Sequence, residues 1–428
     1  MNIHMFHDKP DRPALQVLIY TPIPSDAAYQ PIQRPLFKRI RNRARRHLDL
    51  LTWRATGVWR GHYSTFEDTT GSNSGDIAIR VAAIRQLERL FAGRRLDIIE
   101  ACWGRLGEAL ENYGSPDLLV IAGGGFLFAD RDGCLPPRFF ADIAALESVS
   151  CPVVGVSLGL NRHITEGDNG AFRFDPSQHD AITQFMKRVD LCSVRDHSTQ
   201  DAIAAVTGQI PPVVVDPAFL VGARMPLWRG PTAQRSTLMV GVNVSFHGTY
   251  ATAFNRTLLT SLSRALYRLA QNNPVHFVYF IHSDGERGIV TALRRFGIPL
   301  TVVEGDVDAM LRGYRQLDIH ICQMLHSAIL ATSVGVPTIN LAYDIKCTAF
   351  FDLLDLPQYC RGDGDLTADG LFAGLTELLA SRDEIFAHLA SRRVKLAEEA
   401  VPFYRRIAAT TGIGTAQIEH AARQKSCM

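Results

Sequence analysis

Two basic side chains flank a short apolar stretch of the chain, MLHSAILATSVGVPTINLAYDIK (324–346). His326 lies at the start of a predicted helix that Gly335 and Pro337 end, and Lys346 follows the predicted buried strand after it. Both positions belong to the carboxyl edge of a parallel sheet, where ligands collect. A helix N-terminus favours bound anions and keeps an imidazole neutral unless an anion is present. The pair therefore indicates a proton-transferring histidine beside a site for an anionic ligand.

Charged residues follow two further apolar runs. Arg195 and Asp196 end VDLCSVRD (189–196), and Asp216 ends another run. The planar guanidinium of an arginine suits a carboxylate or a phosphate equally. From the residues alone, Arg195 either pairs with a neighbouring acid or binds an anion. Asp216 is either the partner of a basic residue or a turn former held by Pro217.

Two loops could bring the main chain close to a ligand. In GSNSGDIAI (71–79), Asn73 or Ser74 can cap a helix that begins at Gly75. This is either an ordinary N-cap or a helix start whose free amide groups face a ligand. Three glycines follow the strand LLVIA and permit close approach to the backbone, namely Gly123, Gly124 and Gly125. Phe-Leu-Phe after them breaks the GxGxxG pattern, so a nicotinamide cofactor is not supported.

These residues need a scaffold of parallel strands and helices, and the sequence predicts one. Continuous apolar runs indicate strands buried on both faces, and they occur at 15–20, 96–101, 118–125, 152–159, 189–196, 212–221, 238–245, 275–283, 317–323 and 337–343. Helical periodicity recurs between them, for example over 75–91, 197–208 and 250–273. The alternation predicts an α/β fold with parallel sheets throughout.

The chain is long enough for two domains, since its 428 residues exceed what one core usually fills. A stretch rich in Gly, Pro and polar residues at 222–237 separates the units. We therefore predict Rossmann-like domains over 1–228 and 236–380, with an active site in the cleft between them. Residues 381–428 are predicted as helices that pack back on the first domain, and residues 1–70 as a basic extension of it.

Composition limits the class of protein. Apolar residues make up 46% and charged residues 21%, which is typical of a soluble globular protein. A net charge of +2 does not favour nucleic acid as a partner. The eight cysteines stand singly, without a CxxC pair, and indicate a reducing compartment without a zinc site. No apolar run could span a bilayer and the opening residues lack a signal-peptide core, so we expect a cytoplasmic protein.

A basic segment near the N-terminus, LFKRIRNRARRHLDLL (36–51), has two interpretations. Lys38 and five arginines concentrate within it, with apolar residues beside them. They form either a solvated helix face or a contact with the anionic inner face of the membrane. At such a surface each basic group contributes about 1 kcal/mol.

Six motifs in a fixed order resemble the polysaccharide pyruvyl transferase family. They are NSGD (73–76), GGG (123–125), GVSLG (155–159), SVRD with Ser198, DPAFL (216–220) and LHSAILATSVGVPTINLAYDIK (325–346). The resemblance implies a two-domain fold similar to GT-B glycosyltransferases. It also implies transfer of the enolpyruvyl group of phosphoenolpyruvate (PEP) onto a sugar as a ketal, with release of phosphate. PEP is then the donor, a glycan or its lipid-linked precursor is the acceptor, and neither a tightly bound cofactor nor a metal is expected.

The resemblance also implies roles for individual residues. The family's essential histidine corresponds to His326, its PEP-binding arginine to Arg195, and its lysine to Lys346. Further substrate contacts are expected from Asn73, Asp76, Gly123, Gly124, Gly125, Ser157, Ser327 and Tyr343. His326 is expected to act as base toward a sugar hydroxyl and as acid toward the enol, because bound phosphate would favour its charged form.

One position departs from the family pattern. An arginine usually precedes the Leu-His pair, and here that residue is Met324. A thioether cannot replace a charge-assisted hydrogen bond, which contributes about 1.5–3 kcal/mol. Either another basic residue covers the anion, with Arg162, Arg312 and Arg315 as candidates, or the donor binds differently, or activity is lower.

Two other functions fit the same residues. A GT-B glycosyltransferase would bind a nucleotide diphosphate at the same helix N-terminus, with Asp344 as the nearest acid for a sugar or ribose hydroxyl. A catalytically impaired member would bind glycan or act as a scaffold. Phosphate release from PEP, UDP release from a UDP-sugar, and glycan binding without turnover distinguish the three functions.

Overall fold

The computed structural model describes a defined part of the chain. It covers residues 14–22, 73–130, 132–162, 172–227, 236–245, 254–283, 286–362 and 366–412, with six further positions between 37 and 51. The predicted basic extension 1–70 and its segment 36–51 therefore lie mostly outside the described residues. Four apolar residues that are described in this segment are each more than half exposed, namely Phe37, Ile40, Leu48 and Leu51.

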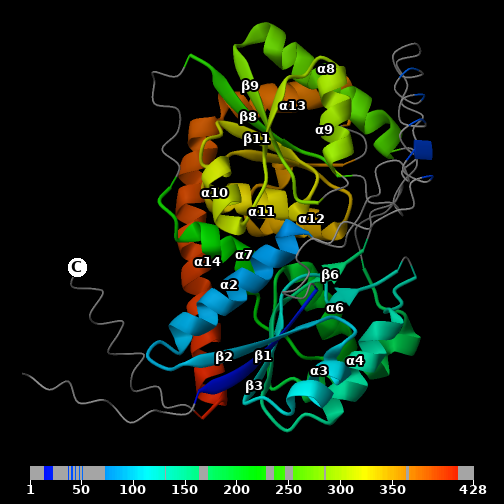
Figure 1. Ribbon diagram of the computed structural model, residues 1–428, viewed down its shortest axis with the longest axis vertical. Coiled ribbons are helices and arrows are strands. Elements are labelled where there is room, and N and C mark those ends of the chain that lie inside the picture. The colour runs from blue at the N-terminus through cyan, green and yellow to red at the C-terminus, as the bar shows by residue number, and fades with distance from the viewer. Residues whose placement is uncertain are drawn as a thin grey trace, which may run out of the picture.

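The first sheet consists of apolar runs that helices cover (Figure 1). Its strands are parallel and lie in the order β2-β1-β3-β5-β7. Their bounds are Leu15–Thr21 (β1), Leu96–Cys102 (β2), Leu118–Ala122 (β3), Val153–Leu158 (β5) and Leu191–Val194 (β7). Every residue of β3 and β5 is buried, as expected for central strands with both faces covered.

Helices follow the strands of this sheet in sequence. They are α2 (Ser74–Leu90), α3 (Leu106–Tyr113), α4 (Pro137–Glu147), α5 (His179–Arg188) and α6 (His197–Thr207), with a short 3-10 turn at Pro176–Gln178. Two very short strands, β4 (Leu127–Phe128) and β6 (Leu160–Asn161), pair in parallel beyond the ends of β3 and β5. The loops after β3, β5 and β7 consequently gather at the carboxyl edge of the sheet.

The second sheet repeats this arrangement. Its parallel strands lie in the order β10-β9-β8-β11-β12-β13. Their bounds are Leu238–Asn243 (β8), Val275–Phe280 (β9), Leu300–Val303 (β10), Ile319–Cys322 (β11), Thr338–Leu341 (β12) and Cys360–Arg361 (β13). The edge strands β10 and β13 were not predicted from the sequence, because short, partly exposed strands give a weak apolar signal.

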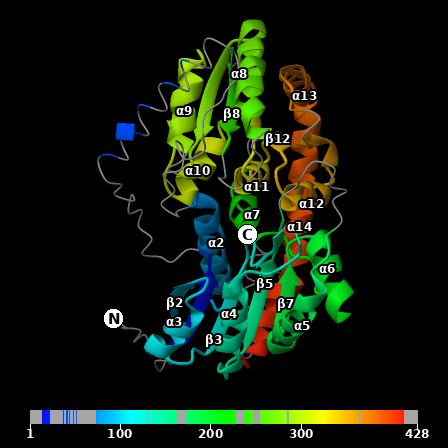
Figure 2. The same cartoon turned by 90° about the vertical axis from the view of Figure 1, so that its right-hand side faces the viewer.

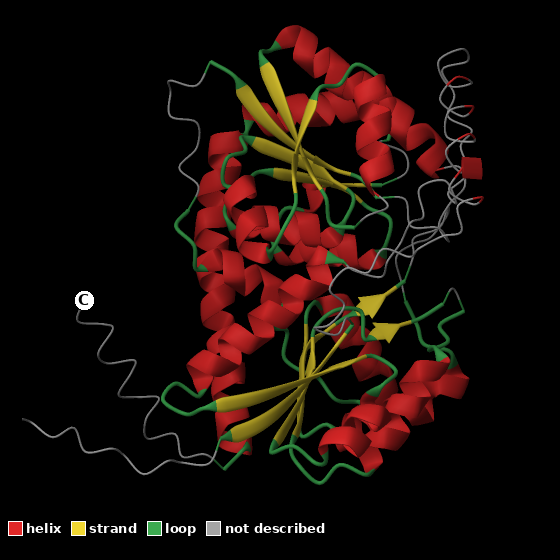
Figure 3. Cartoon of the chain, viewed as in Figure 1, coloured by secondary structure: helices red, strands yellow, loops and turns green. Residues whose placement is uncertain are grey.

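Helices of the second unit flank its sheet on both sides (Figure 3). They are α8 (Phe254–Asn272), α9 (Glu286–Arg295), α10 (Val307–Tyr314), α11 (Leu325–Ser333), α12 (Ile345–Leu353) and α13 (Ala368–Ala380), with a 3-10 turn at Pro357–Tyr359. The predicted fold class, two Rossmann-like α/β units in a GT-B-like arrangement, is confirmed. No helix in the described part of the chain is long and apolar enough to cross a membrane.

One predicted strand, 212–221, is wrong over most of its length. Val213 forms a single parallel bridge with Val194, and the chain then turns into α7 (Pro217–Ala223). Asp216 caps this helix by accepting a hydrogen bond from the amide of Ala218 (3.0 Å). An aspartate at the N-cap followed by a proline in the first turn is a strong helix start, and it outweighs the β-branched residues before it.

Helices α2, α7 and α11 pack against one another between the two sheets, and α14 (Arg382–Thr410) runs alongside both units (Figures 1 and 2). One continuous apolar cluster accordingly includes Val120 of the first sheet and Val240 of the second. Gly222 of α7 lies directly against Ser333 of α11. These contacts hold the carboxyl edges of the two sheets toward each other.

Candidate active site

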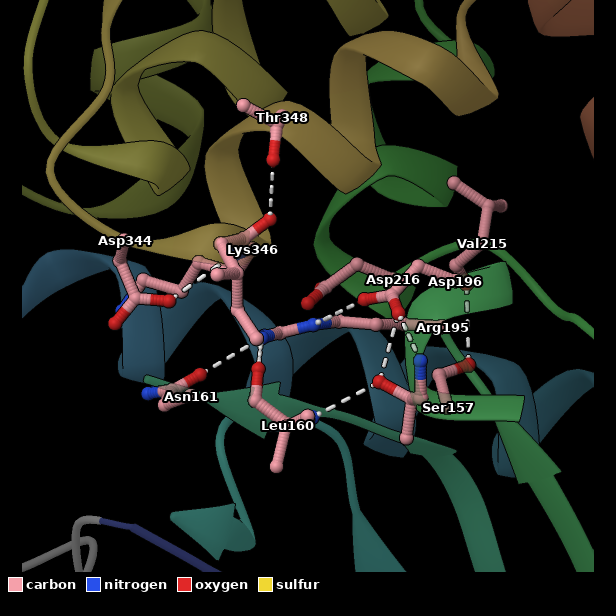
Figure 4. A network of polar contacts seen from close by, with 12 residues as sticks. Ser157, Leu160, Asn161, Arg195, Asp196, Val215, Asp216, Asp344, Lys346 and Thr348 are labelled. Carbon is pink, nitrogen blue, oxygen red and sulfur yellow. Dashed lines mark hydrogen bonds and ion pairs between the residues drawn. The ribbon is translucent and has the colours of Figure 1, made fainter. Parts of the chain in front are cut away.

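The ends of strands from both sheets meet at one place. Arg162, in the loop after β6, accepts a hydrogen bond from the amide of Ile345 in α12 (3.0 Å). Asp344 accepts one from the amide of Arg162 (3.2 Å). Figure 4 shows Asp344 and Lys346 approaching Arg195 from the second unit. Backbone amides and side chains at strand ends converge here, so a ligand is expected at this position.

Arg195 is almost fully buried and is fixed along one side. Its Nε donates to Asp196 (3.3 Å), and its Nη2 donates to the carbonyl of Leu160 (2.9 Å) and the side-chain oxygen of Asn161 (2.7 Å) (Figure 4). Asp196 is itself held as the N-cap of α6, where it accepts from the amide and the hydroxyl of Thr199. Nη1 of Arg195 makes no hydrogen bond within the described part of the chain. Arg195 therefore pairs with its neighbour and still presents one donor.

Glycines give these side chains room. A Cβ atom at Gly159 would overlap the guanidinium of Arg195, and one at Gly125 would overlap the amide of Asn161. Gly123 and Gly124 have φ angles of +58° and +67°, a left-handed conformation that glycine adopts without strain. Sequence reasoning assigned no role to Gly159 or Asn161, although a glycine directly after the strand GVSL is a signal of close approach.

His326 lies in the first turn of α11 and is 8% exposed. Its ring rests on the backbone of α2, because a Cβ atom at Gly75 would overlap the Nδ1. Asn73 caps α2 by accepting a hydrogen bond from the amide of Gly75 (2.9 Å). The Nε2 of His326 is buried, has no hydrogen-bond partner in the described part of the chain, and lies 3.8 Å from the Oδ2 of Asp216. The imidazole thus lies between the start of α2 and the carboxylate that starts α7.

Electrostatic effects show that the predicted basic residues come together. Burial raises the pKa of Asp76, and His326, Lys346 and Arg195 oppose this rise. Burial alone would also raise the pKa of Asp216, but the His326 imidazole and the Arg195 guanidinium hold it below its usual range. The three basic groups come from separate segments; His326 and Arg195 act on both carboxyls, and Lys346 acts on Asp76. Among the residues described, no cluster of three or more His, Cys, Asp or Glu side chains could hold a metal ion.

Lys346 is half-buried in the first turn of α12. Asp344 caps this helix by accepting a hydrogen bond from the amide of Lys346 (3.0 Å). The Nζ of Lys346 lies 5.1 Å from the centroid of the Tyr343 ring, which favours a cation at this position. Tyr343, which follows β12, therefore lies beside the lysine.

Met324 is the N-cap residue of α11 and is buried. Its amide donates to the side-chain oxygen of Asn243 (3.3 Å), so the backbone here is held in place. Of the arginines considered as substitutes, Arg312 and Arg315 lie at the end of α10. Arg162 lies in the loop after β6, and its backbone is hydrogen-bonded to Ile345 and Asp344 at the start of α12. Arg162 is therefore the substitute that adjoins the candidate site.

Two serines expected to bind substrate have buried partners. The hydroxyl of Ser327 contacts the hydroxyl of Tyr314 (2.7 Å) and the Nε2 of His320 (2.8 Å). The hydroxyl of Ser157 donates to the carbonyl of Val215 (3.1 Å). Ser157 also has a φ angle of +50°, which residues other than glycine rarely adopt. In the structure both side chains stabilise the backbone next to the candidate site.

A buried polar network that sequence reasoning did not find lies beneath α11. The hydroxyl of Tyr314 contacts the Nε2 of His282 (2.8 Å), and the carbonyl of His282 accepts a hydrogen bond from the amide of Ser74 in α2 (2.9 Å). Burial lowers the pKa of His282 and of His320 to about 3, so both rings are neutral. The polar pair His-Ser directly after the strand FVYFI was the available signal.

The two α/β units carry basic groups at their common edge. The family model of polysaccharide pyruvyl transferases matches residues 73–345, which is more than half of the chain. The chain belongs to this family, and the resemblance inferred from its motifs is confirmed. No protein with a curated description matches the chain.

Several solved structures resemble this chain at low sequence identity. UDP-GlcNAc 2-epimerase from Neisseria meningitidis has 10% identity and a TM-score of 0.49, over 78% of this chain and 97% of that one. Trehalose 6-phosphate synthase from Burkholderia multivorans has 12% identity and a TM-score of 0.41, over 97% and 98%. TarM from S. aureus has 12% identity and a TM-score of 0.41, over 71% of this chain and 57% of that chain.

Proposed function

We propose that the protein transfers the enolpyruvyl group of PEP onto a sugar as a ketal and releases phosphate. The observation that carries this proposal is the convergence of Arg195, Lys346 and His326 near Asp76. PEP has a carboxylate and a phosphate, so its site needs basic groups from more than one direction. Membership of the pyruvyl transferase family supports the same assignment.

The basic residues are proposed to divide the anionic groups of PEP between them. Arg195 would bind through Nη1, the donor that its own neighbours leave unused. Lys346 would neutralise the second anionic group from the opposite unit. Arg162 is the candidate for the position of the family arginine that Met324 replaces.

The proposed reaction has two steps. A first sugar hydroxyl adds to C2 of PEP while C3 receives a proton, so the CH₂ group becomes a methyl group. A second hydroxyl of the same sugar then displaces phosphate from C2, and its proton leaves with the phosphate. His326 is proposed to accept the proton of the first hydroxyl and deliver a proton to C3, and then to pass the proton of the second hydroxyl to the departing phosphate.

Assays of the purified protein test this proposal. We expect phosphate release from PEP in the presence of one or more members of a panel of p-nitrophenyl galactosides, glucosides and mannosides. The variant His326→Ala should lose at least about 100-fold in turnover, because a general acid-base group contributes that much or more. Near-UV circular dichroism checks that its fold is intact.

The same assays distinguish the alternatives. UDP release from a UDP-sugar, without phosphate release from PEP, would identify a glycosyltransferase. Glycoside binding without either reaction would identify a binding protein. Near-normal activity of His326→Ala would show that another group transfers the protons.

We also propose that the protein is cytoplasmic and contacts the inner leaflet of the membrane through segment 36–51. The exposed residues Phe37, Ile40, Leu48 and Leu51 are spaced as on one helix face, and basic residues stand between them in the sequence. Flotation with phosphatidylcholine vesicles, with and without phosphatidylserine, tests this contact. Binding that needs the anionic lipid supports it, and equal recovery with neutral vesicles argues against it.

A further inference from the structure

Asp216 and His326 come from different helices and share a buried contact. Asp216 starts α7 and His326 lies in the first turn of α11; they are 2% and 8% exposed. The Oδ1 of Asp216 accepts the hydrogen bond that caps α7, from the amide of Ala218. Among the residues that the structure describes, neither its Oδ2 nor the Nε2 of His326, 3.8 Å away, has a hydrogen-bond partner. The Oδ2 of Asp216 is therefore available to interact with the Nε2 of His326.

We propose that Asp216 is a positioning residue for His326, holding its ring in one orientation and stabilising its protonated form. This inference rests on the proposed function, in which His326 moves protons. A carboxylate next to an imidazole favours the imidazolium ion and fixes which nitrogen carries the proton. The contact is longer than a hydrogen bond, as catalytic contacts often are before substrate binds.

The surroundings of His326 make such a partner necessary. Its ring rests on Gly75 in the first turn of α2, and it also lies in the first turn of its own helix. The partial positive charge of a helix N-terminus disfavours an imidazolium ion. The titratable groups around it are Asp76 of α2, Arg195 after β7, Asp216 of α7, His282 after β9 and Lys346 of α12.

Of the two carboxyls in this set, Asp216 has the fixed geometry. Asp216 is fully buried at the start of a helix, whereas Asp76 is half-buried. The pKa of Asp216 lies below its usual range in spite of burial, because His326 and Arg195 stabilise the charged form. Asp216 thus keeps a negative charge beside the imidazole.

One substitution of Asp216 can separate its role as the cap of α7 from its proposed role in positioning His326. Capping needs only Oδ1, and asparagine caps helices as well as aspartate does. Asp216→Asn therefore retains the hydrogen bond to Ala218 and removes the charge beside His326. Asp216→Ser, a shorter neutral cap, is the second variant if Asp216→Asn does not fold.

The first measurement is an NMR titration of the histidine Cε1–H signals in the free protein. The signal of His326 is assigned from its absence in His326→Gln. We expect this signal to titrate at lower pH in Asp216→Asn than in the parent protein, because the variant lacks the carboxylate 3.8 Å from the ring. In the dependence of kcat/KM on pH, the limb that reports His326 should move in the same direction. At its optimum pH, kcat should fall at least about tenfold while KM for PEP changes less than about twofold.

Asp306→Asn is the matched control. Asp306 caps α10 by accepting a hydrogen bond from the amide of Ala309 (2.7 Å) at an exposed position. This variant should leave the titration and the pH profile unchanged. If the His326 titration is unchanged in Asp216→Asn, Asp216 does not act on His326, and this conclusion holds whether or not the parent protein turns over PEP. Lack of PEP turnover by the parent protein would overturn the proposed function instead, and the titration would still report on Asp216.

Discussion

At the scale of single residues, the position of Arg195 depends on the absence of a side chain at Gly159. The φ angle of Gly159 is not in the left-handed region, so alanine is allowed there by its backbone. Its methyl group would nevertheless occupy the space of the guanidinium. We expect Gly159→Ala to displace Arg195 and weaken PEP binding at least about tenfold, which corresponds to the loss of one charge-assisted hydrogen bond. Calorimetric titration with PEP measures this.

Gly107→Ala is the control for this substitution. Gly107 lies in α3, and a Cβ atom there would meet only the Cβ of Ala145, at 4.0 Å. Its PEP affinity should equal that of the parent protein, and its stability should rise slightly because alanine favours the helix. If Gly159→Ala binds PEP as tightly as the parent, Arg195 does not bind PEP in the orientation seen here.

At the scale of helices, the contact between α7 and α11 aligns the two residues of the proposed proton-transfer pair. Gly222 of α7 is buried, and a Cβ atom there would overlap the hydroxyl of Ser333 in α11. We expect Gly222→Ala to push the helices apart, to lower the free energy of unfolding by about 1–3 kcal/mol, and to reduce turnover as Asp216 and His326 separate. Urea unfolding and the phosphate-release assay measure the two effects.

A second substitution on the facing helix tests whether overlap is the cause. Ser333→Gly removes the atoms that the new methyl group would meet. On its own it destabilises α11 by about 1 kcal/mol, since glycine disfavours helices. In the double variant the two changes should cost less than their sum. Strictly additive costs would show that α7 and α11 do not meet through this pair.

Much of the arrangement of helices and strands could be predicted, because central strands such as β3 and β5 are continuous apolar runs. The segment 212–221 was mistaken for a strand because a short apolar run looks the same in a buried strand and a buried helix. Arg195, His326 and Lys346 were expected to lie together because strand ends of parallel sheets share an edge, and all three act on the pKa of Asp76.

Other contacts could not be predicted from local patterns. The approach of Asp216 to His326 depends on how α7 packs on α11, and no periodicity encodes that. Ser327 is adjacent to His326 in sequence, yet the helix turns its side chain toward Tyr314 and His320. The roles of Gly159 and Asn161 depend on where the Arg195 side chain lies, which required the folded chain.

At the scale of the whole molecule, buried titratable groups shape the pH dependence of stability. Burial lowers the pKa of His282 and His320 to about 3 and raises that of Glu286 to about 8. The unfolded chain protonates the histidines more readily, so their contribution is complete above about pH 6.5 and is lost as the pH falls toward 3. The folded chain holds the proton of Glu286 more tightly, so its contribution is lost as the pH rises from about 4.5 to 8.

These opposite signs predict a maximum of stability near pH 6.5. Each group changes the free energy of unfolding by about 1.4 kcal/mol per pH unit within its own range. Among these three groups, the two histidines outweigh the glutamate on the acid side, and the glutamate alone titrates on the alkaline side. Glu286→Gln should abolish the alkaline decline and leave the acid decline in place. Urea unfolding between pH 5 and 8 checks both, and a flat profile for the parent protein would contradict the prediction.

The position of α14 affects the order in which parts of the chain can finish folding during synthesis. This helix is the last one described, and it packs on α2 and β7, which leave the ribosome much earlier. Domains made first usually fold first. Here part of the surface of the first unit stays uncovered until residue 410 has been translated, so the early half of the chain must wait for the late half before its apolar surface is fully shielded.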